Sequence, residues 1–187
     1  MKQNPIVTIE MENGGVMKLE LYPKIAPNTV NNFIYLIRNN AYDGTIFHRV
    51  IKGFMIQGGA GVGDKDFSRY YSIRGEFELN GVKNDLKHTR GVLSMARTSI
   101  MNSACSQFFI MHRDAPHLDG SYAAFGKLIE GESVLDEIAS VQTIFGYDCP
   151  IEEQKIKSMT VETFGENYAE PKMILTKLGE KSPKENW

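Results

Sequence analysis

Short apolar segments separated by turn residues recur along most of the chain, and this pattern constrains the fold more than any other feature. Residues 6–12 alternate apolar and polar side chains, Asn13-Gly14-Gly15 follow, and residues 16–22 alternate again. Alternation, a glycine-bearing turn and renewed alternation predict a β-hairpin. Further short apolar runs lie in the segments TIFHRV, GFMIQGG, GVLSMAR, SQFFIMH, YAAFGKLI and KSMTVETF. The pattern therefore predicts many short strands.

Helical spacing is found in two segments. Pro27 suits the first position of a helix. The apolar residues that follow it recur with helical spacing, at Val30, Phe33, Ile34 and Ile37. The segment 132–140 has a similar apolar face. Many short strands with two helices favour an all-β barrel or sandwich with helical caps over a parallel α/β sheet.

Length and composition indicate one domain with an extension. The chain has 187 residues, and after about Tyr168 it becomes rich in mixed charge and contains two prolines. We expect a domain over residues 1–166 and an extension over 167–187 that is a candidate for loose order. The N-terminal residues lack the apolar run of a signal peptide, and no segment has transmembrane length. With two cysteines and no paired Cys-x-x-Cys spacing, a reducing compartment and a cytoplasmic location are expected.

The sequence gives no support to several other chemistries. A net charge of −2 gives no bulk attraction to nucleic acid. The run GGAGVGDK has Asp64 where a phosphate-binding loop needs lysine. His112 and His117 have no cysteine or acidic cluster beside them, so no metal is expected. Nothing near Cys105 marks it as a nucleophile, and Ser-His-Asp combinations are too common in a chain of this length to be informative.

The stretch FHRVIKGFMIQGG, residues 47–59, places an arginine and a glutamine inside strand-forming sequence. A two-residue loop at Lys52-Gly53 would point Arg49 and Gln57 to opposite faces. A three-residue loop, Ile51-Lys52-Gly53, favours glycine at its last position, and it would place Arg49 opposite Met55. We prefer this second register, in which Arg49, Met55 and Gln57 share one face.

The segment SQFFIMH repeats this mixture of amide and apolar groups. Gln107 and Phe109 share one face of the expected strand, whereas Phe108 and Ile110 share the other. A surface of this kind suits a peptide, because it takes an apolar residue and hydrogen-bonds the flanking backbone.

Together these segments resemble the cyclophilin family of peptidyl-prolyl cis-trans isomerases. FHRVIKGFMIQGG is similar to the family signature F-H-R-x-I-x-x-F-M-x-Q-G-G, and LSMAR, SQFFI and LDGSYAAFGKLIEGESVLDEI follow in the family's order. The resemblance covers roughly residues 5–165. It implies a closed eight-stranded antiparallel β-barrel capped by two α-helices, and an activity that assists protein folding by accelerating rotation about X-Pro peptide bonds.

The resemblance also implies the site. Arg49 matches the catalytic arginine of the family. The residues expected to bind the substrate are Phe54, Met55, Gln57, Ala96, Arg97, Gln107, Phe109, His117, Leu118 and Tyr122. No cofactor is implied. The partners implied are proline-containing peptides and unfolded or folded protein clients, with a monomer as the default state. The alternative is a proline-motif binding module without catalysis.

Several positions depart from the family pattern. Arg97 stands where many relatives have asparagine, His117 where the well-known eukaryotic members have tryptophan, and Tyr122 where they have histidine. The last two resemble the bacterial branch. Because the tryptophan helps to hold cyclosporin, weak cyclosporin binding is expected. The loop 64–75 lacks the usual glycine-rich stretch, which bears on the pocket that receives residues flanking the proline.

Overall fold

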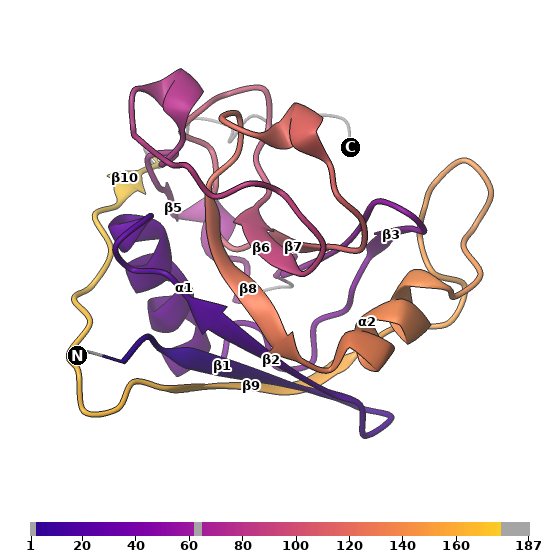
Figure 1. Ribbon diagram of the computed structural model, residues 1–187. Helices are drawn as coiled ribbons and strands as arrows, with labels where there is room; N and C mark the ends of the chain where they lie inside the picture. The colour runs from indigo at the N-terminus through magenta and orange to yellow at the C-terminus, as the bar shows by residue number, and fades with distance from the viewer. Residues whose placement is uncertain (1–2, 62–64, 177–187) are drawn as a thin grey trace.

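The protein is a strongly curled antiparallel sheet with two helices, as seen in a computed structural model that describes residues 3–61 and 65–176 (Figure 1). The strands of the main sheet are β1 (Ile6–Met11), β2 (Val16–Leu21), β3 (Arg49–Ile51), β4 (Met55–Gly58), β6 (Val92–Met95), β7 (Phe108–Met111), β8 (Ala124–Glu130) and β9 (Ile156–Glu162). The helices are α1 (Pro27–Arg38) and α2 (Glu132–Ala139). The predicted hairpin, the two helices and the eight-stranded all-β fold are confirmed.

The sheet has the strand order β3-β4-β7-β6-β8-β2-β1-β9. The expectation of a closed barrel was too strong, because β3 and β9 lie at the two edges and share no ladder. The two ends meet instead through isolated contacts, which include the bridge between Ile46 and Lys155 and the hydrogen bond from the Phe47 amide to the Gln154 carbonyl at 2.9 Å. The edge strand β3 has only three residues, which leaves too few backbone groups in register for a continuous ladder.

The inside of the curled sheet is filled by apolar side chains. Phe33 from α1 contacts the rings of Tyr42, Phe108 and Phe125, with centroids 5.1–5.3 Å apart. All four side chains are fully buried. Aromatic packing of this kind fixes α1 against the sheet, since these rings bury large areas and prefer tilted or edge-to-face contacts.

The register of β3 against β4 differs from the preferred prediction. Arg49 pairs with Gln57 and Ile51 pairs with Met55, so the three-residue loop is Lys52-Gly53-Phe54. Gly53 has a φ of +80° and sits at the third position of a turn closed by a hydrogen bond from the Phe54 amide to the Ile51 carbonyl at 3.0 Å. The predicted register was therefore wrong by two residues, but an even shift preserves the faces, so the predicted shared face is unchanged.

His112 fixes this turn from outside the hairpin. Its Nδ1 accepts a hydrogen bond from the Gly53 amide at 2.9 Å, and its Nε2 lies 3.0 Å from a carboxylate oxygen of Asp136 on α2. The tautomer that satisfies both contacts carries its proton on Nε2. The histidine considered above as a metal ligand thus joins the β3–β4 turn to α2.

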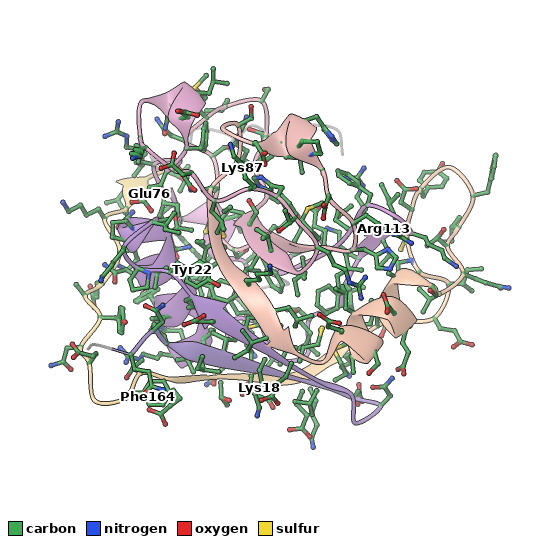
Figure 2. All side chains as sticks on the ribbon, viewed as in Figure 1. Lys18, Tyr22, Glu76, Lys87, Arg113 and Phe164 are labelled. Atoms are coloured by element: carbon green, nitrogen blue, oxygen red, sulfur yellow. The ribbon has the colours of Figure 1, made fainter. Side chains whose placement is uncertain are left out.

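The start of α1 is capped by a distant residue. Ala26 at the N-cap has no side chain that can accept a hydrogen bond. The carboxylate of Glu76 accepts instead from the backbone amides of Asn28 and Thr29, at 3.2 and 2.7 Å, and from the Thr29 hydroxyl at 2.7 Å. Glu76 lies beside the start of this helix in Figure 2. A buried carboxylate here satisfies free helix amides and is favoured by the helix dipole.

The segment after β9 runs back along the domain. Figure 1 shows it passing outside α1 and rising to β10 (Ile174–Leu175), which pairs with β5 (Tyr71–Ser72) in a separate two-stranded sheet. The predicted extension 167–187 is described here up to Thr176, and residues 177–187 lie outside the described residues.

Candidate active site

The outward face of the central strands carries a second apolar cluster. Along β4 and β7, Ile56 and Phe108 point into the main core, and the alternate positions Met55 and Phe109 belong to the outer cluster. Both sets are buried, and β7 is accordingly apolar at all four of its positions. The outer cluster contains Met55, Val92, Ala96, Phe109, Met111, Ala115, Leu118 and Ala124.

A cavity of about 240 Å³ opens over this cluster. It is lined by Arg49, Phe54, Met55, Gln57, Ala96, Arg97, Phe109, Leu118 and Tyr122. Each of these residues was expected at the substrate site from the sequence, and the structure brings them together from three strands and three connections. The floor is buried, whereas the side chain of Arg49 at the edge is 43% exposed. The cavity is therefore an apolar seat with a cation at its margin.

The two remaining expected residues lie beside the cavity. Gln107 accepts a hydrogen bond from the Gln57 amide nitrogen at 2.9 Å and lines a neighbouring, larger cavity. His117, in the 3₁₀ helix η4 (Pro116–Leu118), stacks on Phe54 with ring centroids 5.7 Å apart. Gln107 thus supports the wall of the cavity, and His117 supports its rim.

The two arginines of the cavity differ in their partners. The Arg97 guanidinium donates to the Ser121 carbonyl through Nε and Nη2, at 3.1 and 2.8 Å, and to the Thr98 carbonyl through Nη1 at 2.8 Å. It also lies over the rings of Phe77 and Tyr122. Arg49 donates no hydrogen bond to any residue within 3–61 or 65–176. Arg97 is thus engaged in holding the loops, whereas the N–H groups of Arg49 are available to a ligand.

Among the described residues, Arg49 forms one ion pair, with a residue that sequence reasoning missed. The carboxylate of Asp148 lies 3.6 Å from its Nε atom, and the Asp148 carbonyl accepts a hydrogen bond from the Val50 amide at 2.8 Å. Asp148 belongs to the loop between α2 and β9, shown in orange in Figure 1 close to β3. No local pattern marks this residue, because 99 positions separate it from Arg49 in the chain.

A buried polar network lies beneath the cavity. His88 Nδ1 is 3.1 Å from a carboxylate oxygen of Asp119, and His88 Nε2 is 3.0 Å from the Ser94 hydroxyl. Burial lowers the pKa of His88, and the contacts with Asp119 only partly oppose this shift. Burial alone would raise the pKa of Asp119, but the hydrogen bonds from His88 outweigh it and the pKa is lowered. The neutral ring therefore donates from Nδ1 and accepts at Nε2.

This network has the connectivity of a hydrolase triad, but its exposure is incompatible with that chemistry. Ser94 is 0% exposed and His88 is 1% exposed, so no substrate carbonyl can reach the hydroxyl. The His88 ring instead stacks on Phe109, with centroids 6.0 Å apart. The network holds the floor of the cavity in place.

Other candidate chemistries find no support in the structure. Burial raises the pKa of Cys105 to about 12, so this thiol stays protonated and unreactive. Within the described parts of the chain, no three histidine, cysteine or acidic side chains gather in a way that would hold a metal ion. In the same residues, no helix combines the length and the apolar character needed to cross a membrane.

Comparison with known proteins decides which family uses this arrangement. Residues 6–161 match the family described as "Cyclophilin type peptidyl-prolyl cis-trans isomerase/CLD". The chain belongs to the cyclophilins. The cyclophilin match reaches from the first residue of β1 into β9 and includes every residue of the cavity. The protein is therefore a peptidyl-prolyl cis-trans isomerase, which accelerates rotation about X-Pro peptide bonds.

Curated relatives come from bacteria and eukaryotes. A peptidyl-prolyl cis-trans isomerase of Acinetobacter baylyi is 42% identical over 169 residues, which cover 86% of this chain and 87% of that protein. The isomerase CYP18-1 of Arabidopsis thaliana is 43% identical over 150 residues, which cover 80% of this chain and 91% of that protein.

Solved cyclophilin structures agree with the fold. A cyclophilin-type isomerase of Cryptosporidium parvum, crystallised in the presence of the dipeptide Ala-Pro, has a TM-score of 0.72 and is 35% identical, covering 84% of this chain and 98% of that one. The cyclophilin AquaCyp293 of Hirschia baltica has a TM-score of 0.67 and is 27% identical, covering 83% of this chain and 73% of that one.

Proposed function

We propose that Arg49 is the catalytic residue of this isomerase and that the 240 Å³ cavity seats the proline ring of the client. The observation that carries the proposal is the contrast between the two arginines. Both line the cavity, but Arg97 donates its N–H groups to backbone carbonyl oxygens, whereas Arg49 donates to none of the described residues. A cation with free N–H donors at the edge of an apolar cavity is suited to donate a hydrogen bond to a nitrogen atom of the ligand.

The proposed chemistry follows from the electronic structure of the peptide bond. Rotation is slow because the C–N bond has partial double-bond character, with a barrier of about 18–20 kcal/mol. In the twisted transition state the prolyl nitrogen becomes pyramidal and exposes a lone pair. A donor that reaches this lone pair stabilises the transition state and not the planar ground state. Lowering the barrier by about 5–7 kcal/mol would accelerate rotation roughly 10⁴–10⁵-fold, with no covalent step or proton transfer.

The remaining residues of the cavity bind and orient the client. Phe54, Met55, Phe109 and Leu118 supply apolar contact for the proline ring. Gln57 is 4% exposed and lies directly opposite Arg49 across the hairpin. Its position favours roles in orienting the guanidinium and in binding client backbone.

The clients proposed are proline-containing peptides and unfolded or folded proteins, and the proposed location is the cytoplasm. The Cryptosporidium relative was crystallised in the presence of Ala-Pro, which supports a small proline-containing ligand. Cyclosporin is expected to bind weakly, because His117 supplies a smaller ring at the rim than a tryptophan would. The alternative is a binding module without catalysis, in which Arg49 would contribute to peptide binding and not to the rate of isomerisation.

The test is the Arg49→Ala variant in an isomerisation assay with a short Ala-Pro peptide. We expect the loss of roughly 10²–10³-fold in kcat/KM, a size typical of a preorganised donor lost from a transition state, with peptide binding largely retained. Arg49→Lys should restore little activity, because an ammonium lacks the planar fork of donors.

Arg113→Ala is the matched control. Arg113 is exposed, it lies outside the cavity near the β3–β4 turn (Figure 2), and its substitution removes the same charge. It should retain wild-type turnover. Near wild-type turnover of Arg49→Ala would exclude the catalytic role of Arg49. Only an absence of turnover in the wild-type protein, with peptide binding intact, would favour the binding-module reading.

A further inference from the structure

A second, larger cavity adjoins the proline seat. Its volume is about 490 Å³, and Ala96 and Arg97 line both cavities. A peptide with its proline in the smaller cavity therefore has a flanking residue within reach of the larger one.

Most of the residues that line the larger cavity have polar, uncharged side chains, and Ile100 and Ile174 add apolar surface. Hydroxyl groups come from Ser68, Ser72, Thr98, Ser103, Ser106 and Thr176, and amides from Asn102 and Gln107. Arg97 is the one charged residue among the described residues that line it. Such a wall hydrogen-bonds short polar side chains, and its cation favours an acidic group over a basic one.

One side of this cavity is built by the segment that follows β9. Ile174 and Thr176 line the cavity, whereas the intervening Leu175 does not and is 74% exposed. This alternation is that of a strand with one face on the cavity. Ile174 pairs with Ser72 and Leu175 pairs with Tyr71, and both partners belong to the divergent part of the sequence.

The segment is anchored at several points. Asn28 at the start of α1 donates from its side chain to the Lys172 carbonyl at 3.1 Å and accepts from the Lys172 amide at 2.7 Å. The Thr176 amide donates to the Tyr70 carbonyl at 2.9 Å. Met173 packs against the main core. Because a ladder of two residues per strand is marginal by itself, these anchors hold the wall in position.

We propose that Ile174 in β10 and Thr176 directly after it are specificity-determining residues of the substrate site, which limit the flanking side chain of the client that enters the 490 Å³ cavity. The proposal rests on the proposed seat for the proline ring. The side chain selected is short and polar or acidic, because the opposite walls present hydroxyls, amides and the Arg97 cation.

The test measures kcat/KM for a set of proline-containing peptides. One position is varied at a time, among the three residues before the proline and the two after it, and carries Gly, Ser, Asp, Lys or Trp. The wild-type protein should prefer Ser and Asp to Lys and Trp by about three- to tenfold at one of these positions, a ratio typical of pocket contacts. Ile174→Ala should weaken the discrimination against Trp at that position. Thr176→Trp should strengthen it, so that the Trp peptide loses more of its kcat/KM than the Gly peptide does.

Leu175→Ala is the matched control, since it removes an apolar side chain from the same strand on the face away from the cavity. It should leave the preference unchanged. The proposal is overturned if the wild-type protein shows no preference at any position, or if the Ile174 and Thr176 variants keep the wild-type profile. An equal fall for all peptides, which a folding defect would produce, also counts against it.

Failure of this proposal is distinguishable from failure of the proposed function. The Gly peptide reports on the proline seat and on Arg49 without a flanking side chain. If turnover of the Gly peptide depends on Arg49 while the Ile174 and Thr176 variants keep the wild-type preference, the selective role of these two residues is rejected. The catalytic role of Arg49 is then retained. If turnover does not depend on Arg49, the catalytic role of Arg49 is rejected. The peptide preferences of the Ile174 and Thr176 variants would still test whether these residues select the flanking side chain.

Discussion

The carboxylate of Asp148 lies 3.6 Å from Nε of Arg49, and the backbone carbonyl of the same residue accepts a hydrogen bond from Val50, the next residue of β3. The distance to Nε is that of an ion pair and is too long for a hydrogen bond. Asp148 therefore biases the guanidinium toward one side and leaves its donors free for the client. Its φ of +55° is a conformation that aspartate and asparagine tolerate better than most residues.

Asp148→Asn should lower kcat/KM by about two- to fivefold. Both side chains are nearly half exposed, at 43% and 45%, and an exposed ion pair is worth about 1 kcal/mol or less. The fall should lie in kcat rather than KM, because the substitution loosens the orientation of Arg49 and leaves the apolar seat intact. The measurement is steady-state isomerisation of an Ala-Pro peptide.

Asp85→Asn serves as the control for Asp148, since Asp85 forms an exposed ion pair with Lys83 away from the cavity. It should not change either constant. An unchanged kcat in Asp148→Asn would show that Arg49 is positioned without this carboxylate.

The stability of the protein should fall as the pH drops below about 6.5. Burial lowers the pKa of His88 and of His48, and the positive charge of Arg49 lowers that of His48 further. The unfolded chain then binds more protons than the folded one between the folded pKa and the ordinary value of about 6.5. The stabilising contribution is thus complete above pH 6.5 and is lost as the pH falls through the folded pKa.

Urea unfolding between pH 5 and 8 measures this effect. The free energy of unfolding should decrease toward pH 5, and His88→Gln should show a shallower decrease than the wild-type protein. An identical slope in the variant would mean that the neutral His88 network is not a source of the pH dependence.

Glu76→Ala should destabilise the protein by about 2–3 kcal/mol. The substitution leaves two helix amides and a buried hydroxyl without their acceptor, and charged hydrogen bonds are worth about 1.5–3 kcal/mol. Chemical denaturation measures the loss. Glu153→Ala, which removes an exposed carboxylate from a loop, is the control and should change stability by less than about 0.5 kcal/mol. Equal stability of the two variants would contradict the capping role.

His117→Trp should tighten cyclosporin inhibition by roughly tenfold or more, because a tryptophan at an interface adds apolar area and an N–H donor. The stack of His117 on Phe54 places this side chain at the rim of the proposed seat. Inhibition constants for the wild-type and variant proteins test the prediction, with turnover of an Ala-Pro peptide as the check that the seat is intact. Equal inhibition would place the bound cyclosporin away from this rim.

Most of the fold could be predicted because its signals are local. The hairpin of residues 6–21 follows from alternation around a glycine-bearing turn, and α1 follows from Pro27 and the spacing of the apolar residues after it. The register of β3 and β4 was harder, since Gly53 fits two positions of a short loop. The contact of its amide with His112, 59 residues away, favours the observed turn.

The sequence by itself determined the strand pattern, the two helices and the side chains that share the face of Arg49, because these depend on periods of two and about 3.6 residues within a short segment. Tertiary structure alone decided that Asp148 pairs with Arg49, that Glu76 caps α1 and that Ile174 and Thr176 line the larger cavity. Each of these contacts joins segments far apart in the chain. Their geometry depends on how the sheet curls and where the loops return, and no local periodicity encodes that.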